Sequence, residues 1–580
     1  MINTIWNIAS TLITTLDNNF AEYSPTTLIA GTIAATLLLQ KTYHMQQRWD
    51  TKQIKQSFMN KSIQLLEQVP YIGPKVKAKI DKEVKDLLSG IKSDIDAVRA
   101  DWDTVETLPE VGLSEDAIRR RFEKLTAHYK AGKLSGAVYA EYDEKLSKLL
   151  QEVWGKTALT NPMHSEWPLI NLMEAEIVSM CQNLLHGQRG APGIITHGGS
   201  TSILEACKAY VLQARKNGNE HPEIIVPDTI HVAFDKAADI LHVKLIKIPV
   251  DQTTGEANVT AMEKAITKNT CLMVGSAPSF PFGIIDPINR LGKVALQHNI
   301  ALHVDGCLGG FLTPFAQEAG FDIPGCDFSI PGVTSISIDT HKYGQTPKGT
   351  SVLLFNHDSP ATPTHVYLDW VGGMYVTPSI DGSRSGADIA TVWTVLCHKG
   401  KAEYINETKN ILTLQRELLS DIKKIDGLFI PFNPQLSVIP IQSNDGINAL
   451  VIADRLAKAG WSVNILQTPE QNPAGFHFCL TSVHTQQNNF KQLFIADLTE
   501  AVKYAKANPN EKPKGQAKAY GKLEKGVPQS VQERIGKGYQ QILNTLPNIP
   551  IKGIWSLPEN KAPNHDLPQE TNNLLSLTKS

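Results

Sequence analysis

The sequence predicts an α/β protein with a central, mostly parallel sheet that helices cover on both faces. The first observation is that short apolar runs alternate with helical patterns through the middle of the chain, which is typical of successive βαβ units. The second is the character of the runs, such as EIIV and CLMVG, whose apolar residues suit buried parallel strands. The runs lie at 223–226, 243–248, 271–275, 300–304, 335–338 and 351–355.

Segments with helical patterns separate these runs. They lie at 203–214, 234–241 and 290–299, and a further helix follows Asn258 through 261–266. In a sheet of this kind, ligands bind beyond the carboxyl ends of the strands. Polar residues that directly follow the runs are therefore candidates for a functional site.

Beyond about residue 430 the pattern changes to a smaller α+β unit. Its expected strands lie at 436–441, 462–466 and 477–480, and its expected helices at 447–459 and 490–505. The last seventy residues are rich in Pro, Lys and Asn and predict a loosely packed or disordered tail.

The chain divides into five expected parts. Residues 1–45 form an anchor segment and 46–155 a helical region, in which residues 113–116 resemble a helix start. The main α/β domain follows, and the smaller unit and the tail complete the chain, with bounds at 156–430, 431–510 and 511–580.

An uncharged apolar segment at 26–39 predicts a membrane anchor. Its fourteen residues rise about 21 Å as a helix, and extension to Tyr23 and Tyr43 approaches the roughly 30 Å of a hydrocarbon core. An interfacial or buried helix is the alternative interpretation. Because Lys41 and Arg48 follow the segment, the positive-inside rule directs the rest of the chain to the cytosol.

Composition excludes some classes of function. The net charge of −2 over 580 residues, without a basic stripe, gives no indication of a nucleic-acid partner. The seven cysteines form no CxxC pair, so we expect neither a disulfide framework nor a metal site, and a reducing compartment is favoured.

Lys342 is the first candidate for chemistry. It lies in Thr-His-Lys-Tyr-Gly, just past the apolar run at 335–338. A lysine that forms a Schiff base needs a depressed pKa, which we expect partial burial among polar groups to supply. Taken alone, however, an ordinary lysine at the end of a strand is the simpler interpretation.

Three further signals precede Lys342. A Gly-Gly-Ser-Thr-Ser turn at 198–202 opens a helix, where backbone N–H groups and hydroxyls can bind an anion. His231 follows a strand and can stack on a flat ring, although a lone histidine there more often only begins a helix. Asp305 ends the run at 300–304 and can keep a pyridine nitrogen protonated, or can simply cap a helix.

Each signal is weak, but their order is the one that a type I pyridoxal-phosphate fold requires. The sequence resembles the sphingosine-1-phosphate lyase family, within the group II decarboxylases of that fold, from about residue 64 to 507. The run around Lys342 is long enough to be specific. The stretches that carry the resemblance are SGAVY (135–139), NPMH (161–164), EAEIV (174–178), ILEACKAY (203–210), FPFGIIDP (280–287), LHVDGCLGGF (302–311), GVTSISIDTHKYGQTPKGTS (332–351) and FNPQLSVI (432–439).

The resemblance implies roles for individual residues. Pyridoxal 5′-phosphate would form its imine with Lys342, pair its ring nitrogen with Asp305 and stack on His231. Its phosphate would lie near a set from the glycine-rich turn, the Lys342 turn and a later loop. Other residues would hold the substrate phosphate, and Tyr139 would also carry a proton. The phosphate set is Gly199, Ser200, Thr201, His341 and Ser385, and the substrate set is Tyr139, His164 and Lys348.

The sequence departs from the family at two points. Thr201 stands where the family usually has glutamate, and Ser385 stands where relatives often have proline. Because the Ser200 hydroxyl remains, we expect cofactor binding to survive the first change. In the family, the loop at 382–386 approaches the cofactor phosphate of the partner subunit, so the second change would alter the rigidity of that loop.

The implied activity is cleavage of a phosphorylated long-chain base to a long-chain aldehyde and phosphoethanolamine. The resemblance also implies a homodimer and, in a eukaryotic cell, the endoplasmic reticulum membrane. Two alternatives stay open. An amino-acid decarboxylase of the same fold would need a cation for an α-carboxylate, whereas His164 and Lys348 suit a phosphate. A noncatalytic membrane scaffold would bind no cofactor.

Overall fold

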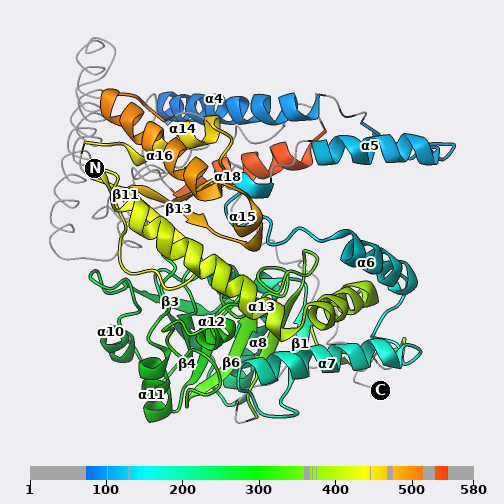
Figure 1. Ribbon diagram of the computed structural model, residues 1–580. Coiled ribbons are helices and arrows are strands. Elements are labelled where there is room, and N and C mark those ends of the chain that lie inside the picture. The colour runs from blue at the N-terminus through cyan, green and yellow to red at the C-terminus, as the bar shows by residue number, and fades with distance from the viewer. Residues whose placement is uncertain are drawn as a thin grey trace, which may run out of the picture. The chain divides into compact units, whose positions relative to one another are not determined.

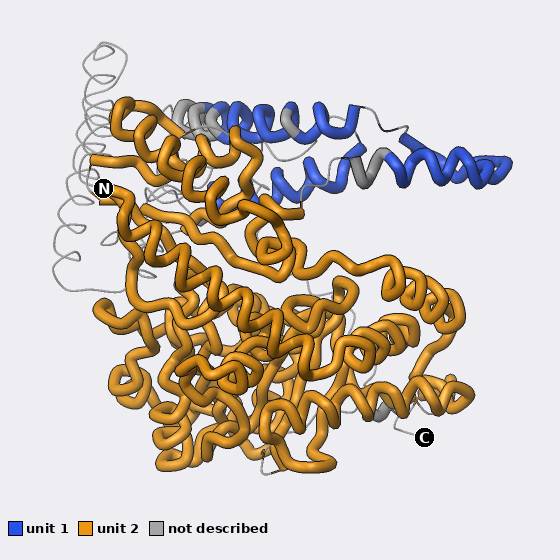
Figure 2. Tube along the Cα trace, viewed as in Figure 1, with its two compact units in different colours: residues 1–129, 514–580 blue, residues 130–513 orange. Residues whose placement is uncertain are grey.

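The computed structural model describes residues 73–546, apart from 101, 103, 128–130, 358, 360–365, 369, 374, 445, 467–473 and 514–528. The predicted anchor at 26–39 lies outside the described residues. Within the described ranges, no helix combines the length and the apolar composition that crossing a bilayer requires. The chain forms two units, residues 130–513 and the two ends of the chain, 1–129 with 514–580 (Figure 2).

The larger unit is built on a seven-stranded sheet in the order β1-β7-β6-β5-β4-β2-β3. The expected parallel pairing holds from β6 through β5, β4 and β2 to β3, whereas β7 runs antiparallel to both of its neighbours. The sheet is therefore mixed. Its strands are β1 (Gly193–Thr196), β2 (Glu223–Pro227), β3 (Lys244–Ile248), β4 (Thr270–Ser276), β5 (Ala301–Asp305), β6 (Val333–Ile338) and β7 (Ser351–Phe355).

Alternate residues of these strands enter two separate cores. In β2, Ile224 and Val226 pack under α8 (Gly199–Lys216) and α9 (Ala233–Leu241), while Ile225 packs into the core on the opposite face. That second core also contains apolar residues of several other helices, and these helices are labelled in Figure 1. Burial on both faces explains why most of these strands, although not the partly exposed β3, appear in the sequence as apolar runs. These helices are α7 (Pro168–Leu184), α10 (Val259–Lys264), α11 (Ile288–His298), α12 (Thr313–Glu318) and α13 (Gly386–Ile422).

Helix α13 bends at Gly400, whose backbone has φ 63° and ψ 171°. A left-handed φ is readily adopted only by glycine, so this residue permits the two helical halves to join. The helix α6 (Glu144–Thr157) packs against α13. A short 3₁₀ turn at Ala131–Lys133 begins the unit, and a hairpin of β8 (Val366–Leu368) and β9 (Tyr375–Thr377) precedes α13.

The expected α+β region is a four-stranded antiparallel sheet in the order β10-β11-β13-β12, with helices beside it. Trp461, Phe478, Phe490 and Phe494 form an aromatic cluster there. The elements are β10 (Leu428–Phe429), β11 (Val438–Ser443), α14 (Ala449–Lys458), β12 (Asn464–Leu466), β13 (Gly475–Cys479), α15 (Ser482–Gln486) and α16 (Phe490–Ala507).

The smaller unit contains α4 (Gly73–Arg99), α5 (Glu115–Ala127) and α18 (Gln529–Asn544). Val84 and Leu88 of α4 pack with Ile535 and Ile542 of α18, and Arg534 forms an ion pair with Asp81. The expectation of a loosely packed tail is therefore wrong for Gln529–Asn544, because this helix presents an apolar stripe that α4 buries.

Truncation of Phe494 is expected to destabilise the larger unit. Its fully buried ring lies 5.1 Å from that of Trp461 and 5.0 Å from that of Phe478, measured between centroids. Phe494→Ala should lower the free energy of unfolding in urea by about 3–5 kcal/mol, because it leaves a cavity. The matched control is Leu493→Ala on the same helix, whose side chain is 52% exposed. Equal losses for the two variants would contradict this account.

Candidate active site

Three polar turns meet at one edge of the seven-stranded sheet. Strands β5 and β6 are parallel neighbours, so Asp305 and the turn that begins at Asp339 emerge on the same side. Strand β1 is antiparallel to β7, and β7 is antiparallel to β6, so β1 runs in the direction of β6. The turn after β1 therefore reaches the same edge, as the family resemblance implies for a cofactor site.

Lys342 lies in the turn after β6, and its Nζ is 2.9 Å from Oδ2 of Asp339. The Asp339 side chain is only 2% exposed. Burial by itself lowers the pKa of Lys342, but the Asp339 carboxylate, with smaller contributions from Cys307 and Asp305, raises that pKa above its usual value. The expected depression of the pKa is therefore wrong for this structure, because Asp339 stabilises the ammonium form.

Asp305 ends β5 and is buried. Its Oδ1 accepts a hydrogen bond of 3.1 Å from the backbone N–H of Cys307, which fixes the orientation of the carboxylate. Two residues earlier, His303 is fully buried, with its ring nitrogens 2.8 and 3.2 Å from the hydroxyls of Ser335 and Ser337. The acid at the strand end is thus held by its own chain.

The glycine-rich turn approaches Lys342 closely. A Cβ added at Gly199 would lie 2.6 Å from Oδ1 of Asp339 and 2.9 Å from Sγ of Cys307, so only glycine fits there. Gly198 has φ 89°, and a Cβ there would lie 3.6 Å from Cε1 of His341. The structure therefore brings the start of α8 beside the Lys342 turn.

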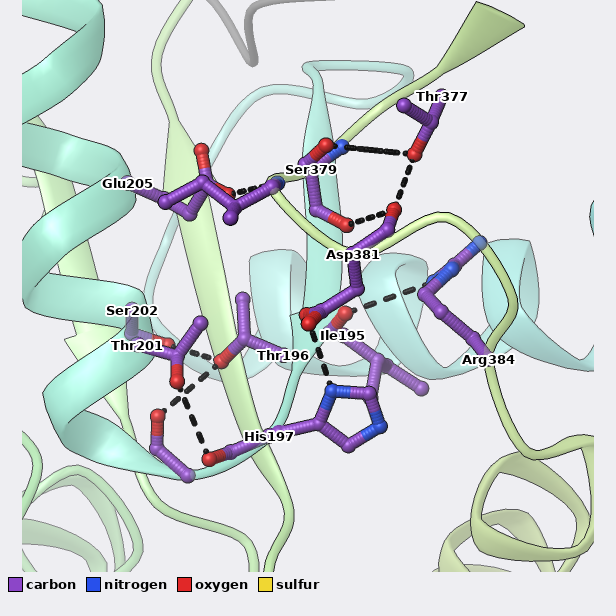
Figure 3. Close-up of polar contacts among 12 residues, drawn as sticks. Ile195, Thr196, His197, Thr201, Ser202, Glu205, Thr377, Ser379, Asp381 and Arg384 are labelled. Atoms are coloured by element: carbon purple, nitrogen blue, oxygen red, sulfur yellow. Dashed lines mark hydrogen bonds and ion pairs between the residues drawn. The ribbon is translucent and has the colours of Figure 1, made fainter. Parts of the chain in front are cut away.

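The hydroxyls of this turn differ in environment. Ser200 is exposed. Thr201, which replaces the family's usual glutamate, donates from Oγ1 to the carbonyl of His197 at 3.2 Å (Figure 3). The threonine hydroxyl therefore closes the first turn of the helix, whereas Ser200 is accessible to solvent.

His341 contacts both ends of the segment that joins β6 to β7. Its Nδ1 donates to the carbonyl of Thr350, and its Nε2 lies 3.7 Å from Oδ2 of Asp339. Burial lowers the pKa of His341, and Lys348 and Lys342 lower it further, against opposing contributions from Asp339 and Thr350. The ring is thus a neutral hydrogen-bonding group at neutral pH.

His231 lies between β2 and α9, half-buried. Its Nδ1 accepts a hydrogen bond of 3.2 Å from the backbone N–H of Ala233, so Nε2 carries the proton of the neutral ring. Because β2 is parallel to β4 and β5, His231 emerges at the same edge as Asp305.

Tyr139 and Lys348, which the family resemblance assigns to the substrate phosphate, contact one another. Nζ of Lys348 lies 4.6 Å from the ring centroid of Tyr139, and the Tyr343 ring meets that of Tyr139 edge-on at 5.0 Å. Burial raises the pKa of Tyr139 well above its usual value, and Cys479 and Asp339 raise it further. Partial desolvation and the charge of Lys342 lower the pKa of Lys348. Tyr139 therefore keeps its proton at neutral pH.

His164 and Ser385 lie on two loops that contact each other. His164 is exposed, and its ring meets that of Trp167 edge-on at 6.0 Å. Among the described residues, no hydrogen bond or ring contact joins His164 to Lys348. Ser385 caps α13 by accepting from the N–H of Asp388 at 3.2 Å. The side chain of Asn161 accepts from the N–H of Arg384, which links the loops.

Sequence reasoning missed the residues that hold the loop before α13. Arg384 forms a two-pronged ion pair with Glu174 and also donates to the carbonyl of Ile195 at 3.4 Å. Asp381 lies 3.0 Å from Nδ1 of His197, beside the glycine-rich turn (Figure 3). Residues 381–384 are therefore bonded to β1 through Arg384 and to the turn after β1 through Asp381.

Comparison with known proteins agrees with this geometry. The model of the pyridoxal-dependent decarboxylase conserved domain matches residues 125–442. A probable sphingosine-1-phosphate lyase of Legionella pneumophila is 41% identical, over 93% of this chain and 94% of its own. Sphingosine-1-phosphate lyase 1 of Rattus norvegicus is 39% identical, over 86% and 87%.

Solved structures of pyridoxal-dependent enzymes are also similar to this chain. The sphingosine-1-phosphate lyase of Burkholderia pseudomallei superposes with a TM-score of 0.66 at 34% identity, over 73% of this chain and 97% of its own. A glutamate decarboxylase of Lactobacillus brevis gives a TM-score of 0.61 at 20% identity, over 72% and 97%, and so shows a shared fold alone.

The burial of His303 predicts a pH dependence of stability. Burial lowers its pKa to about 4, from about 6.5 in an unfolded chain. Between these values the unfolded chain binds a proton that the folded chain does not, so stability falls as the pH falls. Wild type should therefore lose up to about 1.4 kcal/mol per pH unit relative to His303→Gln.

Urea unfolding at pH 7, 6 and 5 checks this difference. Asp286 has its pKa raised to about 7 by burial and acts in the opposite direction, but it is common to both proteins and cancels in the comparison. Parallel stability curves for wild type and His303→Gln would disprove the assignment.

Proposed function

This chain belongs to the sphingosine-1-phosphate lyases of the pyridoxal-dependent decarboxylase family, and on that premise we propose that it cleaves phosphorylated sphingoid bases. The products would be a long-chain aldehyde and phosphoethanolamine. The observation that carries the proposal is similarity along almost the whole chain to the lyase of Legionella pneumophila. The shared fold with a glutamate decarboxylase does not favour decarboxylation, because 20% identity supports the fold alone.

The residues at the sheet edge fit pyridoxal phosphate. Oδ1 of Asp339 is buried without a hydrogen-bond partner, and the neighbouring space at Gly199 excludes any side chain of this protein's own. The start of α8 offers backbone N–H groups to an anion there. When bound, the cofactor supplies an electron sink for the bond that breaks beside the substrate amine.

Asp305 and Asp339 would have opposite tasks. Asp305, held by the N–H of Cys307, would keep the ring nitrogen protonated. Asp339 would receive or share the proton that Lys342 must release before its Nζ can act as a nucleophile, since Oδ2 lies 2.9 Å away. His231 would support the flat face of the ring, and Ser200 with His341 would bind its phosphate.

Tyr139 and Lys348 would act on the substrate. Lys348 supplies a positive charge for a phosphate monoester, together with His164. Tyr139, protonated at neutral pH and beside Lys348, would hand its phenolic proton to the reacting carbon or to a substrate oxygen. Because its ring is buried, bulk water would reach that proton slowly.

We also propose the membrane attachment and the dimer that the family resemblance implies. Residues 26–39 would anchor the chain in a membrane, in eukaryotes that of the endoplasmic reticulum, with the catalytic part in the cytosol. The apolar tail of the substrate partitions into lipid, which gives an anchor a physical purpose. Two copies would form a dimer in which the loop carrying Ser385 approaches the partner's cofactor phosphate.

Replacement of Lys342 tests the central role. Purified wild type should release aldehyde and phosphoethanolamine from a phosphorylated sphingoid base, and Lys342→Ala should release neither. Borohydride reduction followed by peptide mapping should attach the pyridoxyl group to Lys342. The control is Lys268→Ala, an exposed lysine just before β4, which should keep both products. A label on another lysine, or carbon dioxide release from glutamate instead, would refute the proposal.

Removal of residues 1–45 tests the anchor. The shortened protein should move from the membrane pellet to the supernatant on centrifugation, and it should still cleave substrate presented in detergent micelles. A matched full-length control should stay in the pellet at high salt. Equal pelleting of both proteins would argue against an anchor in this segment.

A further inference from the structure

The turn that carries Lys342 has an unusual backbone just after the lysine. Gln345 has φ 59°, a left-handed conformation that costs a residue with a side chain free energy. A Cβ added at Gly344 would lie 2.5 Å from the carbonyl oxygen of Thr340, so the chain doubles back tightly. A backbone of this kind persists only where its surroundings hold it.

Two tyrosine hydroxyls hold this turn. Tyr404 of α13 donates to the carbonyl of Gly344 at 2.7 Å, and Tyr142, just before α6, donates to the carbonyl of Gln345 at 2.7 Å. Burial raises the pKa of Tyr142 to about 12 and that of Tyr404 well above its usual value. Both hydroxyls therefore remain donors throughout the neutral pH range.

An ion pair with a buried lysine contacts the side chain of Gln345 in the same turn. The side-chain amide of Gln345 donates to Oε2 of Glu407, whose Oε1 lies 3.0 Å from Nζ of Lys399. The side chain of Lys399 is 6% exposed and also pairs with Glu403. Lys399 directly precedes the bend of α13 at Gly400. The Lys399 ammonium also lies 5.5 Å from the ring centroid of Tyr404.

Buried charges of this kind are expensive and often add nothing to stability when compared with apolar packing. The two tyrosine hydroxyls nevertheless bond the carbonyls of Gly344 and Gln345, and Glu407 holds the side-chain amide of Gln345. None of these groups has a part in the chemistry described above. A role in fixing the geometry of the Lys342 turn explains both the presence of these costly charges and their position, because small displacements of a reacting group cost large factors in rate.

We propose that Tyr142 and Tyr404, supported by Glu407 and Lys399, are positioning residues for Lys342. They fix the backbone at Gly344 and Gln345, and hence the direction in which the lysine amino group approaches the cofactor and the substrate. The proposal rests on the proposed role of Lys342 and adds the residues that orient it.

The test compares tyrosine-to-phenylalanine variants of the full-length enzyme loaded with cofactor. Tyr142→Phe and Tyr404→Phe each remove one hydroxyl and keep the ring. The matched control is Tyr210→Phe. Tyr210 is buried, as Tyr404 is, but its hydroxyl bonds Thr334 and Ser335 near the start of β6, at the end of the strand away from Lys342.

Tyr142→Phe and Tyr404→Phe, the turn variants, should each weaken the circular dichroism of the cofactor's visible band, which reports ring orientation. Each should also shift the pH at which that band changes. Each should lower kcat by about tenfold with KM nearly unchanged, and the double variant by up to about a hundredfold. Tyr210→Phe should lose comparable resistance to urea yet keep the band and kcat.

Glu407→Gln is a second variant, which keeps shape and removes charge. Glu407→Gln should also weaken the visible circular dichroism band of the cofactor. Glu144→Gln, which removes a charge from an exposed ion pair with Lys148, should leave the band unchanged. If wild type is active and the turn variants match Tyr210→Phe in band and kcat, the positioning role is refuted while the proposed function stands. If wild type shows neither band nor aldehyde, the proposed function fails, and this inference fails with it.

Discussion

The pairing of β1 and β6 with the antiparallel strand β7 is the constraint from which the site follows. Thr196 at the end of β1 pairs with Ser351, and Ile338 at the end of β6 pairs with Val352, the next residue of β7. A single strand thus aligns the glycine-rich turn with the Lys342 turn. A slip of one residue in this register would exchange the faces of the sheet and separate Gly199 from Asp339.

Charge in the site is balanced within a small, poorly solvated space. Asp339 compensates the ammonium of Lys342, and Asp305 is held separately by a backbone N–H. At the neighbouring loop, Arg384 and Glu174 are both nearly buried and satisfy each other. Such pairs do little for stability but fix geometry, since either partner left alone would carry an uncompensated charge. The edge of the sheet is therefore rigid where a cofactor would bind.

The sequence predicted the strands from β2 to β7 within two residues at each end. Burial on both faces leaves apolar runs in strands such as β2 and β7, whereas β3 is exposed or partly exposed along its length and contains two lysines. It did not reveal β1, whose Gly-Ile-Ile-Thr is too short for a periodic signal, nor that β7 reverses direction. Asp305 and Gly199 could be nominated because turns after strands are local features, whereas His341 was nominated only through the family resemblance. The raised pKa of Lys342 could not be predicted from the sequence, because it depends on where the Asp339 carboxylate points.

The packing of α4 against α18 joins segments from opposite ends of the chain. During synthesis, residues 130–513 must all be made before α18 emerges from the ribosome. At about 5–20 residues per second, α4 waits tens of seconds with Val84 and Leu88 uncovered. Helix α4 is thus translated early, and its apolar face is covered late. A chain interrupted near residue 513 would retain every strand of both larger sheets and yet keep a bare apolar stripe that chaperones and proteases recognise.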